Sequence, residues 1–253
     1  MSDPPPLSFD DAIDVLRRIV GQRIVLVGGQ AVNYWAERYA HNVKALRAAM
    51  PFTSKDIDFQ GLRGDVEECA RRLDGTALLA SFDDHTPNSG IVRFKDKRGH
   101  DRTIDFLASV AGVDDKQLLA TAVPVPLPRG AGEVLVMHPT LCLESRAHNV
   151  AWLPGYDGPP GRKQLRAAIF CAREFIAEAL SAGEVRQALG MSERIFKLAL
   201  NRTGIVLAVD KRFDVFRAVR PHRALPMGFR KRRYPQMVAE LAKERARVAR
   251  RRK

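Results

Sequence analysis

Three aspartates lie in short apolar segments that could bring their carboxylates together. Asp56 and Asp58 belong to KDIDFQG, in which acidic and apolar residues alternate, and Asp105 belongs to RTIDFLAS. Alternate positions of a β-strand point to one face, so Asp56 and Asp58 are expected to project together. Ile57 and Phe59 would then enter the core. Two carboxylates this close repel each other unless a proton or a cation is present. Mg²⁺ is the natural partner, because it prefers oxygen ligands and shares its shell with phosphates and water.

The third aspartate could complete a site for two metal ions. Ile104, Phe106 and Leu107 flank Asp105, and such a setting is costly for a carboxylate without a partner. Two ions together would stabilise the attacking and the leaving oxygen of an in-line displacement at phosphorus. Asp105 is therefore a candidate ligand and a candidate catalytic group.

A glycine pair precedes these aspartates in the chain. The apolar run 24–27 predicts a buried strand, and it ends in Gly28-Gly29, where a helical pattern begins. The two glycines would let the backbone approach a phosphate group, with free amides of the following helix directed at it. Taken singly, the glycine pair is more often a tight turn and the Asp-x-Asp is more often solvent-facing charge, while one aspartate in a hairpin strand is nearly uninformative. Their order along the chain indicates a common site.

The segments LVGGQA, SKDIDF and TIDFL resemble the three-part signature of the polymerase-β-like nucleotidyltransferase superfamily, and in style they are similar to the AbiEii-type toxins. The resemblance implies an α+β nucleotidyltransferase fold, in which a small mixed sheet with flanking helices is followed by a helical domain. It implies a nucleoside triphosphate substrate, such as ATP, with Mg²⁺ or Mn²⁺ as the cofactor. Asp56, Asp58 and Asp105 would be the metal ligands, with Asp105 near the acceptor hydroxyl.

The same resemblance implies a set of nucleotide-binding residues. These are Gly28, Gly29, Gln30, Ser54, Lys55 and Arg146. Lys55 is explained equally well as a surface lysine. Arg146 lies in CLESRAHNV, in the half of the chain where the toxins carry a lysine-bearing motif. Gln30 is part of a departure from the pattern, because a small hydroxyl residue often follows the first glycine there.

The basic residues gather at the C-terminus. The net charge is +13, and residues 230–253 carry eleven Lys or Arg and two Glu. Such a tail attracts polyanions through counterion release, which points to RNA or DNA. The pattern favours a tail helix that becomes ordered mainly on binding. In the alternative, Met237, Val238, Leu241 and Val248 form a stripe that belongs to the helical core.

Composition and pattern give the expected organisation. We expect a catalytic domain over 1–137, a helical domain over 138–229 and a basic tail over 230–253. No apolar run reaches the roughly 20 residues that span a bilayer, and the first residues lack the features of a secretory signal. We therefore expect no membrane contact. The three cysteines are far apart and odd in number, which favours buried free thiols in a reducing cytosol and hence a cytoplasmic protein. The prolines of 123–128 exclude a central strand there. The segments GIVRFKD and RTIDFLAS flank a polar turn and predict a β-hairpin. An apolar stripe predicts a helix from about Lys163 to Leu180.

Several functions stay open from the residues alone. The first is transfer of a nucleotide to RNA, with a tRNA-like acceptor and a toxin role implied by the resemblance, together with a possible antitoxin partner. The second is nucleotidylation of a small molecule such as an aminoglycoside, which would need an acidic cleft rather than a basic chain. The third is a non-catalytic nucleic-acid binding protein, against which the three intact aspartates argue.

Overall fold

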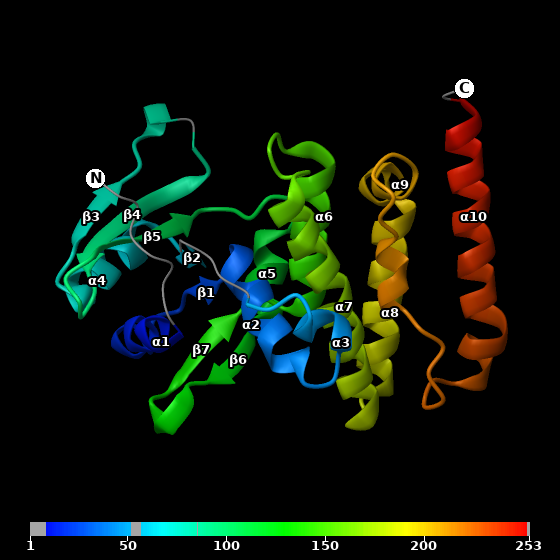
Figure 1. Ribbon diagram of the computed structural model, residues 1–253, viewed down its shortest axis with the longest axis horizontal. Helices are drawn as coiled ribbons and strands as arrows, with labels where there is room; N and C mark the ends of the chain where they lie inside the picture. The colour runs from blue at the N-terminus through cyan, green and yellow to red at the C-terminus, as the bar shows by residue number, and fades with distance from the viewer. Residues whose placement is uncertain (1–8, 52–56, 85, 252–253) are drawn as a thin grey trace. The chain divides into compact units, whose positions relative to one another are not determined.

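The structure is a computed structural model that describes residues 9–51, 57–84 and 86–251. The chain is of the α+β class, with a mixed seven-stranded sheet and many helices (Figure 1). It divides into two compact units. One comprises Met1–Tyr34 with Pro51–Cys142, and the other comprises Trp35–Met50 with Leu143–Lys253. The first holds the whole sheet, and the second is helical.

The sheet has the strand order β3-β4-β5-β2-β1-β7-β6. Its strands are β1 (Val25–Leu26), β2 (Ile57–Gln60), β3 (Thr76–Leu79), β4 (Asn88–Lys95), β5 (Asp101–Leu107), β6 (Val123–Pro126) and β7 (Glu133–Val136). The pairs β2/β5 and β1/β7 are parallel, and the other neighbours are antiparallel. The sheet is therefore mixed, with two short parallel pairs at its centre.

Local sequence explains most of these strands. The expected hairpin forms from β4 and β5, and Gly99 in its turn has a φ of 82°, a conformation that glycine adopts without steric cost. The strand with two prolines, β6, is at the edge of the sheet, where a missing backbone donor leaves no neighbour unpaired. The exclusion of a central strand at 123–128 is confirmed.

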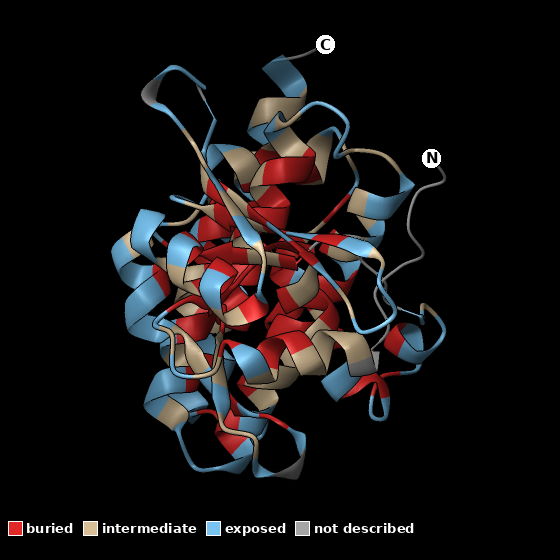
Figure 2. Cartoon of the chain, turned by 90° about the vertical axis from the view of Figure 1, so that its left-hand side faces the viewer, coloured by how far each residue is buried: buried red, intermediate tan, exposed pale blue. Residues whose placement is uncertain are grey.

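One helix of the first unit, α4 (Arg63–Leu73), packs on the sheet. The other helical elements of this unit are α1 (Phe9–Arg18), which contacts α4, α5 (Asp115–Thr121) and the 3₁₀ turns η1 (Phe82–Asp84) and η2 (Pro128–Gly130). Val66, Cys69 and Leu73 of α4 are buried, and α4 packs on β3 and β4. The buried residues that Figure 2 draws in red run through the strands and onto the inner sides of such helices.

The helical unit is built around two long helices. Its elements are α3 (Lys44–Arg47), α7 (Pro159–Ser181), α8 (Val185–Leu200), α9 (Arg202–Val209), the 3₁₀ turn η3 (Val215–Ala218), the π-helical turn η4 (Phe229–Arg233) and α10 (Tyr234–Arg251). Two further helices, α2 (Gly28–Ala40) and α6 (Pro139–Trp152), are divided by the boundaries between the units. The predicted apolar stripe of α7 is confirmed, since Leu165, Ala168, Ala172 and Ile176 are all buried.

The basic C-terminal segment is not a free tail, and the expectation that it becomes ordered mainly on binding is wrong. It forms α10, which packs on α8 and α9 with Met237 and Leu241 buried. Val238 is 45% exposed, so the packed stripe is narrower than the four-residue alternative. Arg245 also donates to both carboxylate oxygens of Asp214, at 2.6 and 3.1 Å. Burial of two large apolar side chains and this ion pair hold the helix in place.

Two other features bear on the sequence predictions. All three cysteines, Cys69, Cys142 and Cys171, are free and buried, as predicted. No helix in the described ranges combines the length and the apolar character that a membrane span requires.

Candidate functional site

Asp58 and Asp105 are direct neighbours in the sheet. The parallel strands β2 and β5 pair with Asp58 opposite Asp105. Residues in register on adjacent strands point to the same face, and adjacent strands are about 4.8 Å apart. Both side chains are half-buried. The two carboxylates therefore stand side by side on one face of the sheet, although 46 positions separate them in the sequence.

The apolar residues between them hold this register from the opposite face. Ile57 and Phe59 of β2 and Ile104 and Phe106 of β5 are all buried. The rings of Phe59 and Phe106 pack with centroids 5.8 Å apart. A slip of one residue would carry these side chains to the other face and the aspartates into the core. The predicted inward direction of Ile57 and Phe59 is confirmed.

The backbone of Gly28 lies against the Asp58 carboxylate. The amide of Val27 donates to the carbonyl oxygen of Asp58 at 2.9 Å, which continues the pairing of β1 and β2. Gly28 has a φ of 64°, and a Cβ built on it would be 1.9 Å from Oδ2 of Asp58. Such a separation is far inside van der Waals contact, so only glycine fits here without a shift of the carboxylate.

Helix α2 starts at this point. The amide of Ala31 donates to the carbonyl oxygen of Val27 at 3.1 Å, which is the first hydrogen bond of the helix. The amides of Gly28, Gly29 and Gln30 precede that bond, and such amides have no acceptor within their own helix. They are suited to an anion, and the helix dipole adds to this preference. The structure thus brings the glycine pair and two of the three aspartates together.

The remaining predicted site residues are distributed as follows. Ser54, Lys55 and Asp56 lie outside the described residues. Gln30 is half-buried, and its Oε1 accepts from Asn33 at 3.5 Å. No group of three His, Cys, Asp or Glu side chains in the described ranges is arranged to hold a metal ion. The described part of the proposed donor set is therefore the pair Asp58 and Asp105.

Arg146 belongs to the helical unit. It is 8% exposed on α6 and donates to Oε1 of Gln164 at 2.9 Å and to Oγ of Ser145 at 3.3 Å. These contacts fix the guanidinium within that unit. Its predicted role at a triphosphate stays a prediction.

The comparisons with known proteins add little to this geometry. No protein-family model and no curated protein sequence matches the chain. Among solved structures, the chain is similar to the crystal structure of JHP933 from Helicobacter pylori. The sequence identity is 13% and the TM-score is 0.37, with 97% of this chain and 94% of that chain covered. A likeness at this level does not establish a common fold.

One basic residue on the aspartate face was missed in the sequence. Arg93 of β4 pairs with Thr103 of β5, which is two residues from Asp105. Alternation then puts Arg93 on the same face as Asp105, on a neighbouring strand. Arg93 is exposed and forms no ion pair with a described residue. The predicted hairpin includes Arg93, but only the register of its two strands shows that Arg93 and Asp105 share a face.

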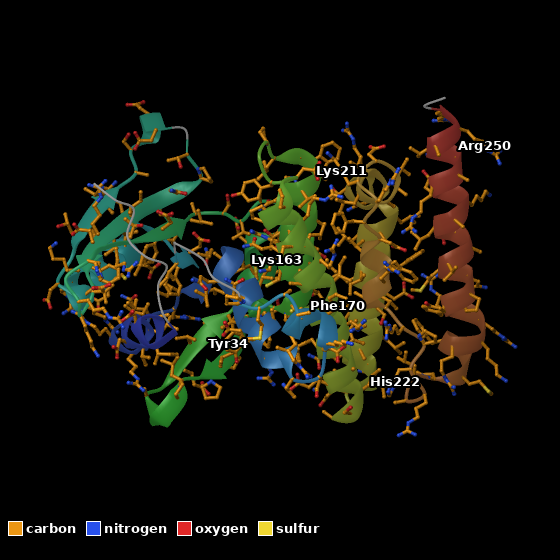
Figure 3. All side chains as sticks on the ribbon, in the orientation of Figure 1. Tyr34, Lys163, Phe170, Lys211, His222 and Arg250 are labelled. Carbon is orange, nitrogen blue, oxygen red and sulfur yellow. The ribbon has the colours of Figure 1, made fainter. Side chains whose placement is uncertain are left out.

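A second group that the sequence did not reveal lies in the helical unit. Five arginines line a cavity of about 270 Å³ together with Phe170 and Phe213. They are Arg166, Arg173, Arg212, Arg217 and Arg220. Figure 3 labels Lys163 and Phe170 on α7 and Lys211 in the segment after α9, the two parts of the chain that meet here. A signal was present, because residues 211–223 contain five Lys or Arg and one Asp.

Proposed function

We propose that this protein is a nucleotidyltransferase that moves a nucleoside monophosphate from a nucleoside triphosphate to a hydroxyl group of RNA. The observation that carries the proposal is the register of β2 and β5, which sets Asp58 beside Asp105. The close approach of Gly28 to Asp58 supports it, because it joins the glycine turn to the carboxylates. The α+β architecture is compatible with a nucleotidyltransferase fold, which is part of the proposal.

The donor set fits a hard divalent cation. Asp58 and Asp105 offer carboxylate oxygens from adjacent strands, and Asp56 would add a third. Oxygen ligands from two or three carboxylates, completed by phosphate oxygens, suit Mg²⁺ or Mn²⁺. When bound, the ions would supply positive charge near the attacking and the leaving oxygen.

Groups of the protein itself would bind the triphosphate and activate the acceptor hydroxyl. Asp105 would accept a hydrogen bond from the acceptor hydroxyl and favour loss of its proton. The amides of Gly28, Gly29 and Gln30 would bind phosphate oxygens of the triphosphate. The new bond joins the acceptor oxygen to the α-phosphorus, and the bond from that phosphorus to the pyrophosphate oxygen breaks. Arg93 would stabilise the pyrophosphate charge from the same face of the sheet.

The acceptor class follows from charge. The chain carries a net +13, and the arginine-lined cavity of the helical unit adds a concave basic surface. A polycationic acceptor such as an aminoglycoside would be repelled by these groups, whereas the RNA backbone would be attracted. The resemblance to AbiEii-type toxins suggests a tRNA-like acceptor, a cytoplasmic toxin role and an antitoxin partner, all of which belong to the proposal.

The test is transfer of label. The protein is incubated with each α-labelled nucleoside triphosphate, Mg²⁺ and total RNA, and labelled RNA is separated on a gel. We expect one nucleotide to be preferred and EDTA to abolish transfer. Asp105→Asn should reduce the rate at least about a hundredfold, the range for loss of a positioned acid or base. Asp58→Asn should cause a similar loss, because it removes a carboxylate ligand of the proposed metal site.

The matched control is Asp101→Asn. Asp101 lies on the same strand as Asp105, but it is exposed and pairs with Lys95 at 2.9 Å. The Asp101→Asn variant should transfer nucleotide at the wild-type rate. The proposal is wrong if the wild type binds RNA but transfers no label, and the three variants behave in the same way. The protein would then be a non-catalytic RNA-binding protein.

A further inference from the structure

All described residues that line the arginine-lined cavity belong to the helical unit. Arg166 and Arg173 come from α7, Arg217 from η3, and Arg212 and Arg220 from the segments on either side of η3. The floor is apolar, since Ile169 and Phe213 are buried. Concave basic surfaces over an apolar floor strengthen the attraction for an anion, because the low-dielectric wall focuses the field.

Most of this positive charge is not neutralised by carboxylates of the described residues. Arg173 pairs with Glu174 at 2.9 Å. Among the described lining residues, the one carboxylate is that of Asp214, which accepts from Arg245 at 2.6 and 3.1 Å. The other four arginines are exposed and make no ion pair with any carboxylate in the described ranges; they are Arg166, Arg212, Arg217 and Arg220. Like charges gathered in this way are unfavourable in the free protein, and an anionic ligand would relieve their repulsion.

The backbone at Arg212 is strained. Its φ is 60°, one of two positive values among non-glycine residues in the described part of the chain. Glycine is the usual residue in this conformation after a helix. Arg212 follows α9 closely, and Phe213 then donates its amide to the carbonyl oxygen of Leu207 at 2.8 Å. Strained non-glycine residues cluster at ligand sites, so the arginine at this position points to a use for its side chain.

The arrangement of the aromatic rings in the cavity favours binding of a phosphate group over stacking of a nucleotide base. Phe213 is approached by the guanidinium groups of Arg162 and Arg166, at 4.8 and 5.8 Å from the ring centroid. Arg173 lies 4.7 Å from the centroid of Phe170. The aromatic faces thus support arginine side chains and are not open platforms for a base. Guanidinium groups bind phosphates with two parallel hydrogen bonds.

We infer that this cavity binds the phosphodiester backbone of an RNA strand. Four uncompensated arginines on two different segments match successive phosphates of a strand better than one small anion. The inference deepens the proposed function and rests on it for the identity of RNA as the acceptor. The cavity would hold the strand through its phosphates without selecting its sequence.

The test is RNA binding without catalysis. A short unstructured RNA oligonucleotide is titrated in EDTA, without nucleoside triphosphate, at a series of salt concentrations. The triple variant Arg166→Gln, Arg212→Gly, Arg217→Gln should reduce the slope of log affinity against log salt by about two, because each phosphate contact on a single strand contributes about 0.7. Arg212→Gly alone should already flatten the slope, and it should not unfold the protein, because glycine relieves the strain.

A matched triple variant removes the same charge elsewhere. Arg23→Gln, Arg63→Gln, Arg186→Gln replaces three exposed arginines that make no ion pair with a described residue, and its slope should stay close to that of the wild type. Equal slopes for the two triple variants would overturn the inference. Displacement of the RNA by ATP or by polyglutamate at equal charge concentration would also overturn it, in favour of a nucleotide pocket or an acidic protein partner.

The two proposals fail in different ways. If RNA binding depends on the cavity but no label is transferred by the wild type, the cavity assignment stands and the nucleotidyltransferase assignment does not. If label is transferred and the cavity variants bind RNA like the wild type, the acceptor docks elsewhere and only this inference is wrong.

Discussion

At Gly28 the backbone lies so close to Asp58 that no side chain fits between them. The Cβ of an alanine would be 1.9 Å from Oδ2 of Asp58, and the φ of 64° is unfavourable for any residue but glycine. We expect Gly28→Ala to displace the carboxylate and abolish nucleotide transfer, and to lower the free energy of unfolding by about 1–3 kcal/mol. Transfer assays and denaturant titrations measure the two effects.

The variant Gly21→Ala serves as a control that introduces backbone strain without a steric clash. Gly21 has a φ of 84°, but no atom lies within 4 Å of the position that a Cβ would take there. This variant should lose less stability than Gly28→Ala, because only backbone strain acts on it, and it should keep its transfer rate. Equal rates in the two variants would mean that the approach of Gly28 to Asp58 has no bearing on activity.

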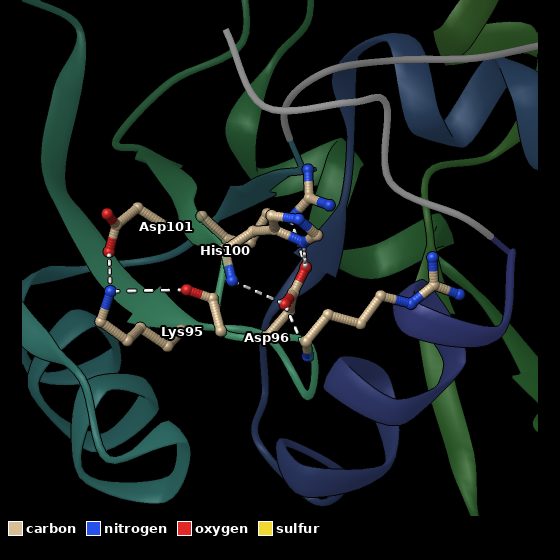
Figure 4. A network of polar contacts seen from close by, with 7 residues as sticks. Lys95, Asp96, His100 and Asp101 are labelled. Atoms are coloured by element: carbon tan, nitrogen blue, oxygen red, sulfur yellow. Dashed lines mark hydrogen bonds and ion pairs between the residues drawn. The ribbon is translucent and has the colours of Figure 1, made fainter. Parts of the chain in front are cut away.

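Asp96 stabilises the turn that brings β5 alongside β4 (Figure 4). Its side chain is 3% exposed and accepts from Nε of Arg102 at 2.9 Å and from the amides of Arg98 and His100 at 2.9 and 3.0 Å. Burial opposes ionisation most strongly. The hydrogen bonds from His100, Arg102 and Arg98 together outweigh it and lower the pKa of Asp96 to about 2 from its ordinary value of 3.8. The folded protein therefore keeps this carboxylate ionised where the unfolded chain would protonate it.

A depressed pKa gives a defined pH dependence. The stabilisation from Asp96 is fully present above its unfolded pKa of 3.8 and is lost as the pH falls toward the folded value of about 2. Asp96→Asn should lower the free energy of unfolding at neutral pH by about 2 kcal/mol, the scale of hydrogen bonds to a charged group. Its stability should then fall less than that of the wild type between those two pH values. Thermal melts of both proteins across this pH range test the prediction. Parallel profiles of stability against pH would mean that Asp96 does not have the lowered pKa.

At the scale of the elements, α10 combines a packed face with a basic one. Met237 and Leu241 are buried, and Tyr234 stacks on Phe216 with ring centroids 5.7 Å apart. Arg250, labelled in Figure 3, is exposed near the end of the helix. Removal of the whole segment would strip apolar cover from the helical unit. The contribution of its charges to RNA binding is better tested by replacing exposed arginines than by truncation.

The packing of α10 predicts a contrast between neighbouring positions. Leu241→Ala should lower the free energy of unfolding by about 3 kcal/mol, because it leaves a cavity in a buried site. Val238 is 45% exposed, so Val238→Ala should cost less than about 1 kcal/mol. Urea titrations of both variants measure this difference. Similar small losses for both would mean that α10 does not pack as described.

At the scale of the whole molecule, the cysteines report on each unit separately. Cys69 and Cys142 belong to the unit that holds the sheet, and Cys171 belongs to the helical unit. All three are buried, and burial raises the pKa of the Cys69 thiol to about 12. The reactive thiolate form is therefore almost absent at Cys69 in the folded protein.

Thiol labelling should follow unfolding unit by unit. Without denaturant, none of the three cysteines should react within the time in which a free thiol is fully labelled. With increasing denaturant, mass spectrometry of the labelled peptides should show each cysteine reacting as its own unit opens. Rapid labelling of Cys171 in the native protein would contradict the packing of α7.

The sequence alone determined the local features of this protein. Alternation of apolar and acidic residues predicts the strand of Asp58 and the inward direction of Ile57 and Phe59, because side chains on a strand alternate by position. The stripe on α7, the β4–β5 hairpin and the exclusion of a central strand at 123–128 follow from equally local rules. Helix α5 and the turns of the helical unit were not predicted, because short elements have weak periodic signals.

Only the tertiary structure decided which distant residues meet. The register of β2 with β5 is set by buried side chains on both strands and by their pairing across the sheet, and no pattern within one segment specifies it. The cavity of the helical unit depends in the same way on α7 meeting the segment after α9, so its arginines come from two separate segments of the sequence. Burial of Met237 and Leu241 likewise required partners from other helices. An amphipathic pattern predicts that one face of a helix will be buried, but packing between elements determines which surface buries it.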